Sequence, residues 1–422
     1  MPFLGKFRAL TRVQRNTFSA CFLGWTLDAF DFFLLTFCLT AIAADFHVGR
    51  KQVVAAVSWT LVMRPVGAFL FGTDGTMAEK FGRRPTLMLN IIAFSVFELA
   101  SAVAPSLHSF LVCRALFGIA MGGVWGVGAA LALETLPAEG RGFFSGLLQE
   151  GYVVGNLLAA ALYGLLFSHL TGHGIWTNWR VMFMIGTLPA LLAFYLRFNV
   201  EESPAWLASH HASAVAGEAP KRPPLDWHVL VSYLPTFLFL VLLMTAFTSF
   251  SHGTQDLYPT FLADHGLSSG LAGLVAAISN LGALSGGMCC GALSERFGRR
   301  RTIVCAALLA IPMIPLWAWS HTVVTLAVGG FLMQFMVQGA WGIIPVHLNE
   351  LAPAPVRAVF PGLAYQIGNL LSSQNIRVQE AFAIRHNTGS LKVALSGTVI
   401  IVALVVASVT ALGPEAKGAD LS

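Results

Sequence analysis

Charged residues are scarce in this sequence. Asp, Glu, Lys and Arg make up only 11% of its 422 residues, whereas about 25% is usual in a soluble globular domain. Hydrophobic residues make up 56%, and the mean hydropathy is +0.72. Apolar runs of roughly 20 residues, each long enough to cross the hydrocarbon core of a bilayer, recur from end to end. This composition excludes a soluble domain and predicts a polytopic helical membrane protein.

Catalytic and metal-binding motifs are also missing. The sequence has no HExxH, P-loop or GxSxG pattern, and its longest polar segment is 200–228. Its six cysteines lie inside apolar runs without a CxxC pair, so we interpret them as small core residues. The net charge of +5 needs no nucleic acid, because the positive-inside rule of membrane proteins accounts for it. We expect no enzyme, no metal, no cofactor and no nucleic-acid partner.

Twelve apolar runs are candidate membrane spans. They lie at 18–44, 52–73, 86–104, 108–134, 142–168, 179–199, 229–258, 269–292, 302–319, 322–348, 358–383 and 391–412. The segment 200–228 has the Ala, Pro and charge content of a linker, and it divides the chain into six-helix bundles at 1–199 and 229–422. With both termini in the cytoplasm, 17 of the 25 Lys and Arg residues lie on or next to that side. The positive-inside rule then predicts a multi-pass protein of the plasma membrane, such as a bacterial inner membrane, with a cytoplasmic linker.

The two halves repeat two short motifs. "GTMAEKFGRRPTL" at 75–87 matches "GALSERFGRRRTI" at 291–303, and "ETLPAEGR" at 134–141 matches "ELAPAPVR" at 350–357. Both pairs are offset by 216 residues. Two separate motifs at one offset indicate an internal duplication.

This plan resembles the major facilitator superfamily, in which two parallel six-helix repeats bind substrate between them near the bilayer midplane. The stretch from Gly75 to Arg84 looks like the signature loop between the second and third spans of that superfamily. The resemblance implies an all-α membrane fold of twelve transmembrane helices. It also implies that charged loop residues pair with neighbouring helices and hold the cytoplasmic side shut. These candidate gating residues are Glu79, Arg83, Arg84, Glu295, Arg296 and Arg299.

A longer motif carries a closer resemblance. Ser251-His252-x-Thr254-Gln255-Asp256-x-x-x-Thr260 is similar to the seventh-span motif of the lactate/pyruvate proton symporters, which are relatives of the sialic acid transporters. The similarity extends over nearly the whole chain and implies proton-coupled symport of a small monocarboxylate. Two positions depart from the pattern. Val124 stands where family members often have an acidic residue, and Arg377 occupies a typically uncharged position.

Ionisable residues inside the spans indicate where a site lies, because each costs about 2.5–3.5 kcal/mol at the centre of a span unless it is paired or hydrated. Asp28 and Asp31 share one helix face, which suits a proton carrier but also helix capping or pairing with an arginine. His252 and Asp256 are one helical turn apart and can share a proton, although His252 also fits a loop. Pro259 interrupts the helix beside them.

The expected mechanism is uptake of a carboxylate and a proton by alternating access. An arginine holds the carboxylate through a charge-assisted pair, and polar side chains bind the rest of the substrate. The candidate substrate-binding residues are Arg64, Arg114, Arg377, His252, Gln255, Asp256, Gln366 and Asn369, and the candidate proton-coupling residues are Asp256, His252, Asp28 and Asp31.

Four alternatives stay open. Arg377 can instead extend its charge to the membrane interface, and the polar residues of the eleventh span can instead serve helix packing. A larger organic acid such as sialic acid would use the aromatic residues Trp25, Tyr152, Trp341 and Tyr365. A non-transporting membrane receptor is the most remote alternative function. The expected partners are a small organic carboxylate, H⁺ and the lipid bilayer, and the expected oligomeric state is a monomer.

Overall fold

The computed structural model of this chain is all-helical over the residues that it describes. These are 3–72, 77–170, 172, 174–208, 231–353, 357, 359–385 and 391–419. Most of the predicted linker 200–228 lies outside them, as do the side chains of Glu79 and Arg377. The described part therefore covers the apolar runs and most of the candidate site residues.

The first half of the chain contains helices of very different length. They are α1 (Phe3–Arg8), α2 (Arg12–Asp45), α3 (Arg50–Gly72), α4 (Met77–Phe81), α5 (Arg83–Ala102), α6 (Leu107–Gly122), α7 (Val124–Thr135), α8 (Arg141–Gln149), α9 (Gly151–Leu166), α10 (Asn178–Ile185) and α11 (Ala190–Asn199). Thr11 and Gln14 form a capping box that begins α2 six residues before the predicted start of the first span, because their side chains satisfy free backbone N–H groups.

The second half repeats this pattern. Its helices are α14 (Leu234–Gln255), α15 (Tyr258–Asp264), α16 (Ser269–Phe297), α17 (Arg299–Ala310), α18 (Ile314–Ala318), α19 (Val323–Gly342), α20 (Ile344–Leu351), α21 (Phe360–Ser372), α22 (Asn375–Arg385) and α23 (Leu391–Leu412). Pro259 lies in the first turn of α15, where its missing N–H costs nothing. The predicted interruption after Gln255 is therefore present.

Ten helical stretches of the described chain are long and apolar enough to cross a membrane. The two other predicted spans, 142–168 and 358–383, are built from the helix pairs α8–α9 and α21–α22, which are broken in the middle. Each predicted apolar run is therefore helical over most of its described residues, and the predicted all-α fold is confirmed. The division into bundles at 1–199 and 229–422 stays a prediction.

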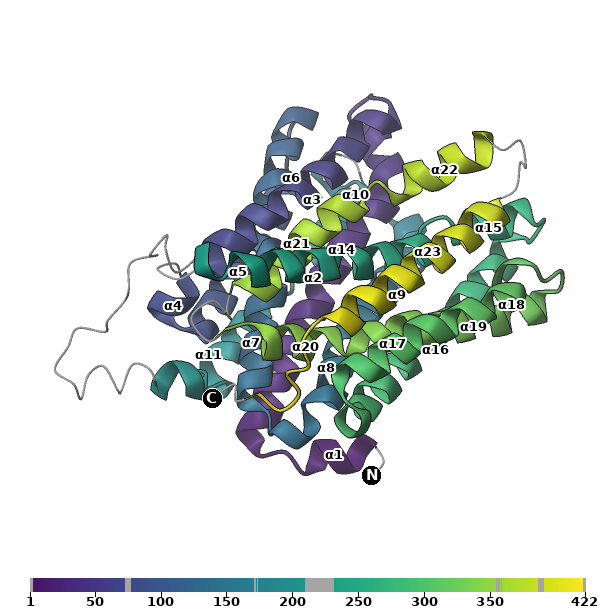
Figure 1. Cartoon of the computed structure of the whole chain (residues 1–422). Helices are drawn as coiled ribbons and strands as arrows, with labels where there is room; N and C mark the ends of the chain where they lie inside the picture. Colours follow the sequence, from purple (N-terminus) through teal and green to yellow (C-terminus); the bar gives the residue numbers. More distant parts are fainter. Residues whose placement is uncertain are drawn as a thin grey trace.

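Helices from the two halves pack closely on one face of the molecule. We call this the terminal face, because both ends of the chain lie there (Figure 1). On this face α8 lies along α16, whereas α9, which continues α8 past Glu150, makes few contacts with α16. A Cβ atom added to Gly146 would overlap the backbone of Gly287, so the two helix backbones touch as they do in small-residue helix pairs. The terminal face is closed in this structure.

Candidate substrate and proton sites

Aromatic rings from both halves meet between the bundles. Tyr365 of α21 lies 4.6 Å from Trp125 of α7 and 5.7 Å from Trp341 of α19, measured between ring centroids. Trp25 of α2 stacks 5.9 Å from Tyr152 of α9 and contacts Tyr365 edge-on at 6.2 Å. We call these five residues the aromatic cluster. It places all four residues of the predicted alternative site, with Trp125, in one contiguous group that spans the two halves.

Backbone and amide oxygens hold the tryptophans in place. Gln149, at the break between α8 and α9, accepts from Trp25 Nε1 through its backbone oxygen at 3.3 Å and from Trp125 Nε1 through its side-chain oxygen at 3.1 Å. Trp341 Nε1 donates to the Phe247 carbonyl at 3.0 Å. Since the indole N–H of each tryptophan in the aromatic cluster has a partner, these rings are fixed in orientation.

Arg64 of α3 lies beside the aromatic cluster and forms no ion pair among the described residues, although Asp28 is an electrostatic neighbour beyond ion-pair distance. Its side chain is buried, at 5% exposure, and its Nη2 is 3.3 Å from Met121 Sδ. The guanidinium carbon lies 4.9 Å from the centre of the Phe32 ring. In the described part of the chain no carboxylate lies within 4.0 Å of Arg64, and its Nε has no hydrogen-bond partner. A buried guanidinium in this state can bind a carboxylate.

Arg114 of α6 was also predicted to bind substrate, but its environment differs from that of Arg64. Its Nη2 is 2.6 Å from Glu98 Oε2, and both side chains are fully buried. Its Nε donates to Ser101 Oγ at 3.0 Å, and the Phe117 ring lies 4.0 Å away. The structure thus places Arg114 in an ion pair inside the first half. This position gives no support to the predicted role of Arg114 in binding substrate.

The two aspartates of α2 are buried but point toward different arginines. Asp28 interacts electrostatically with Arg64. A Cβ atom added to Gly186 would lie 2.9 Å from Asp31 Oδ1 and 3.1 Å from Glu98 Cγ, so Asp31 lies next to the Glu98–Arg114 pair. Neither oxygen of Asp31 has a hydrogen-bond partner among the described residues. An unpaired buried carboxyl is favoured in its neutral form, which is the state expected of a loaded proton carrier.

His252 and Asp256 of α14 form the predicted contact. His252 Nδ1 lies 3.1 Å from Asp256 Oδ2, and the side chains are 35% and 27% exposed. Asn369 of α21 is in hydrogen-bonding range of both His252 and Tyr365. Tyr152 of the first half has both Arg64 and Asp256 as electrostatic neighbours. The polar residues of α14 are therefore connected through Asn369 to the aromatic cluster.

Two glutamines of α19 belong to this site and were not predicted. Gln255 Nε2 donates to Gln334 Oε1 at 2.8 Å, and Gln334 Nε2 donates to Thr254 Oγ1 at 3.2 Å. One turn further along α19, Gln338 Nε2 donates to Ser251 Oγ at 3.0 Å. The signal in the sequence is a pair of glutamines four residues apart within an otherwise apolar run. They hold α14 and α19 together beside the site.

The broken eleventh span also binds α14. In α22, Asn375 Nδ2 donates to the Ser249 carbonyl at 3.1 Å and Gln379 Nε2 donates to the Gly253 carbonyl at 2.9 Å. Gln366 of α21 is buried, and its Oε1 has no hydrogen-bond partner among the described residues. Gln366 therefore stays a candidate for substrate contact, whereas the side chain of Arg377 lies outside the described residues.

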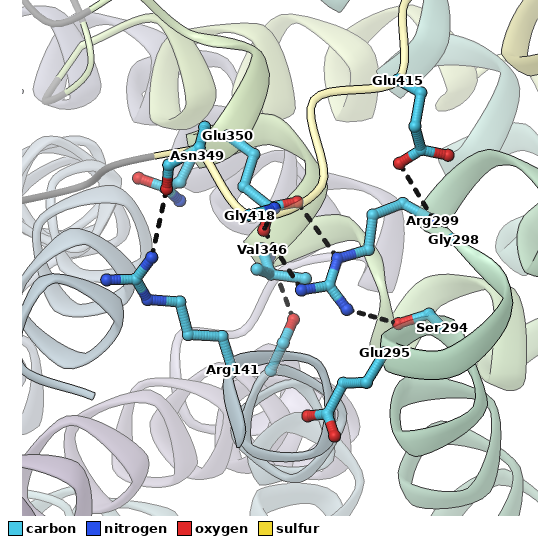
Figure 2. A network of polar contacts seen from close by, with 12 residues as sticks. Arg141, Ser294, Glu295, Gly298, Arg299, Val346, Asn349, Glu350, Glu415 and Gly418 are labelled. Atoms are coloured by element: carbon cyan, nitrogen blue, oxygen red, sulfur yellow. Dashed lines mark hydrogen bonds and ion pairs between the residues drawn. The ribbon is translucent and has the colours of Figure 1, made fainter. Parts of the chain in front are cut away.

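On the terminal face, equivalent ion pairs occur in the two halves. Arg299 binds Glu350 through Nε and Nη2, both at 3.1 Å, and donates from Nη1 to Ser294 Oγ at 2.7 Å (Figure 2). In the first half Arg83 Nε lies 3.6 Å from Glu134 Oε2. Arg83 and Arg299 are 216 residues apart, as are Glu134 and Glu350. The prediction that these arginines pair with carboxylates is therefore correct, and their partners come from the second repeated motif.

A glutamate after the last span of each half caps the helix that begins in the arginine motif of the same half. Glu202 accepts from the backbone N of Arg83 at 2.8 Å, and Glu415 accepts from the backbone N of Arg299 at 3.1 Å. Arg84 Nη1 donates to the Val200 carbonyl at 3.0 Å. These carboxylates satisfy N–H groups at the N-termini of α5 and α17, where the helix dipole also favours negative charge. Burial raises the pKa of Glu202 above its usual value, although these N–H groups oppose the shift.

Hydrogen bonds also cross between the halves on the terminal face. Glu295 Oε1 accepts from the backbone N of Phe143 at 3.0 Å, so this predicted gating residue reaches the opposite half. Ser145 Oγ donates to the Gly342 carbonyl at 2.8 Å and accepts from Val346 N at 3.0 Å. Arg296 is exposed, with its guanidinium carbon 5.8 Å from the Phe297 ring, and its gating role stays a prediction.

Comparisons with known proteins agree with this architecture. The chain is 28% identical over 397 residues to the carboxylic acid transporter protein homolog of Saccharomyces cerevisiae, which covers 90% of this chain but only 63% of the yeast protein. It is 27% identical over 366 residues to the sialic acid transporter NanX of Escherichia coli, covering 86% of this chain and 85% of NanX. The structure of the proton:xylose symporter XylE bound to 6-bromo-6-deoxy-D-glucose has a TM-score of 0.76 at 19% identity, covering 97% of this chain and 98% of XylE.

The family assignment rests on most of the chain. A model described as Major Facilitator Superfamily matches residues 21–373, from the first predicted span into the eleventh. The match includes both ion-pair motifs and the aromatic cluster. The chain therefore belongs to the Major Facilitator Superfamily of membrane transporters and is not an enzyme.

Proposed function

We propose that this protein is a secondary transporter that carries a small organic monocarboxylate, of the lactate or pyruvate type, together with a proton. The observation that carries the proposal is Arg64, a buried guanidinium beside the aromatic cluster with no carboxylate within 4.0 Å in the described chain. A substrate carboxylate would supply the missing anion through a charge-assisted pair. The organic-acid class is also supported by the names of the yeast and Escherichia coli relatives.

The remainder of the substrate would meet polar groups of the second half. Asn369 lies in hydrogen-bonding range of His252 and Tyr365, so it can turn toward a hydroxyl or carbonyl oxygen of the substrate. Gln255 already donates a hydrogen bond to Gln334, so its proposed role is to form part of the surface around the substrate. Small hydroxy and keto acids carry an oxygen next to the carboxylate, which suits a cation on one half and amides on the other.

Two carboxyl groups are proposed proton carriers. Asp31 is buried with no hydrogen-bond partner, and Asp256 contacts His252 at the partly exposed end of α14. Asp28, which lies toward Arg64, links the proton site to the proposed carboxylate site. Movement of one proton with one monoanion carries no net charge, so that transport step would be nearly insensitive to membrane voltage.

The geometry also suggests an orientation. We propose that the terminal face is cytoplasmic and that the structure represents a state closed on that side. Rocking of the two halves about the central site would then open it, as in other major facilitator proteins. The positive-inside rule supports this orientation because Arg83, Arg84, Arg299 and Arg300 gather there.

A second candidate substrate is a larger organic acid such as sialic acid. Five aromatic residues in mutual contact offer more ring surface than a three-carbon acid would cover, and one relative is a sialic acid transporter. The two candidate substrates differ in the role that they give to the aromatic cluster. A sugar acid would stack against these rings, which would make the cluster a part of the binding site.

Proteoliposomes test both candidates. Addition of lactate or pyruvate outside should raise the external pH as protons enter with the acid, and Asp256→Asn should abolish the change. Uptake of labelled sialic acid without any pH response to lactate or pyruvate would reject the small-acid proposal and favour the larger substrate. Failure of every acid tested would reject the organic-acid class.

A further inference from the structure

Glu150 is a buried carboxyl group at the contact between the two halves. It lies at the break between α8 and α9 and is 1% exposed. A Cβ atom added to Gly287 of α16 would overlap Glu150 Oε1. The carboxyl group thus occupies the space left by the missing side chain at position 287. Glu150 belongs to the first half by sequence, but its carboxyl group is sealed by the second half.

This carboxyl group has no polar partner. Neither Oε1 nor Oε2 forms a hydrogen bond with any described residue. The titratable or charged side chains on the elements packed around it include Arg141, Glu295, Arg296, Asp28, Asp31, Tyr152, His347, Glu350, Tyr365 and Glu134. None of them forms an ion pair with Glu150. Glu134 is engaged instead with Arg83, and Glu295 with the backbone of Phe143.

The closed contact therefore fits only one protonation state. An ionised carboxylate sealed in this position would lose its hydration without gaining a cation or a hydrogen-bond donor, which costs several kcal/mol. The neutral acid avoids most of this cost. When α8 and α16 separate at the terminal face, water reaches Glu150 and the ionised form becomes favourable.

We infer that Glu150 is a proton-binding site whose occupation is required for the terminal face to close. On closing, the carboxylate takes a proton from a hydronium ion and releases water; on opening, the carboxylic acid returns the proton to water on that side. The inference rests on the alternating access of the proposed function, but not on the identity of the substrate. If closure requires this proton, the equilibrium between the open and closed terminal face depends on pH even when no substrate is present.

The distance between spin labels on the two halves tests this inference. Ala138, before α8, and Phe297, at the end of α16, are both exposed on the terminal face and can carry labels on cysteine, in the full chain with its six native cysteines replaced. In lipid nanodiscs without substrate, the ratio of long to short distances should rise with pH by up to about tenfold per unit, as expected for one proton. Glu150→Gln, which imitates the neutral acid, should remove this response and keep the short distance.

The matched control is Glu295→Gln. It removes another carboxyl group from the same interface but keeps an amide oxygen that can accept from Phe143 N, so it should retain the pH response. Glu150→Ala should lose the pH response as Glu150→Gln does. Agreement between the two variants would attribute the loss to the missing carboxyl group and not to a folding defect of one variant. A parent protein without a pH response, or a Glu150→Gln protein that responds as the parent does, would overturn the inference. Because no acid is transported in this experiment, rejection of the proposed substrate would leave its result intact.

Discussion

At the scale of single residues, Arg64 and Arg114 differ in whether a carboxylate already lies within ion-pair distance of the guanidinium. Arg114 has Glu98 at 2.6 Å, whereas Arg64 has a thioether and an aromatic ring. Hydrogen bonds to a charged group are worth about 1.5–3 kcal/mol, so Arg64→Gln should raise the KM for the transported acid by about 10- to 100-fold. Arg64→Lys, which keeps the charge but loses the planar fork, should have a smaller effect. Uptake kinetics in proteoliposomes measure both.

The matched variant for Arg64→Gln is Met121→Leu. It removes the sulfur contact of Arg64 and keeps the apolar volume, so KM should stay near that of the parent. An unchanged KM in Arg64→Gln, with normal yield and a monodisperse protein, would show that the carboxylate binds elsewhere.

The Glu98–Arg114 pair should instead govern stability. Removal of one partner of a fully buried ion pair costs about 3–5 kcal/mol, because the other charge stays buried without compensation. Arg114→Gln and Glu98→Gln should each lower the thermal unfolding temperature in detergent by several degrees. The double variant should be less destabilised than the sum of the two. Strict additivity of the two losses would mean that the pair does not act as a unit.

At the scale of elements, the N-terminus of α5 depends on a residue far away in the sequence. Glu202 accepts from the backbone N–H groups of Arg83 and Arg84, and loss of a helix cap costs about 0.5–2 kcal/mol. Burial raises the pKa of Glu202 above the ordinary value of 4.5. The folded protein thus holds this proton more tightly than the unfolded chain, and the contribution of Glu202 to the free energy of unfolding falls as pH rises through this range.

Thermal unfolding at several pH values checks this sign. Relative to Glu202→Gln, which cannot titrate but can still cap α5, the parent should lose stability between pH 4.5 and neutral pH. Glu202→Ala should be less stable than Glu202→Gln at every pH. A parent that gains stability over Glu202→Gln as pH rises would mean that the N–H groups, and not burial, dominate the ionisation of Glu202.

The sequence predicted the secondary-structure elements better than it predicted the contacts between single residues. Long apolar runs predicted the helices within a few residues, because hydrocarbon thickness sets a minimum length, and the 216-residue offset located both arginine motifs. The ion pair of Arg114 with Glu98 was not predicted because Glu98 lies on another helix, and no local pattern reveals such a pair. Gln334 and Gln338 had a periodic signal, but a polar face can serve packing as well as binding.

At the scale of the whole molecule, transport requires that α8 and α16 separate on the terminal face. Phe143 and Glu295 lie across this contact, since Phe143 N donates to Glu295 Oε1 at 3.0 Å. A pair of cysteines at these positions, joined by a short reagent with two thiosulfonate groups, would hold the halves together. Transport should then be abolished, because rigid-body rocking cannot occur around a covalent link.

Reduction of the link provides the internal control for this prediction. Dithiothreitol should restore uptake to the level before the reagent was added, and each single cysteine variant should be unaffected by the reagent. Binding of the substrate from the opposite side should survive in the linked protein, since the link alters neither the aromatic cluster nor Arg64. Continued transport by fully linked protein would mean that the contact between α8 and α16 is static, and the mechanism would then require a path between other helices.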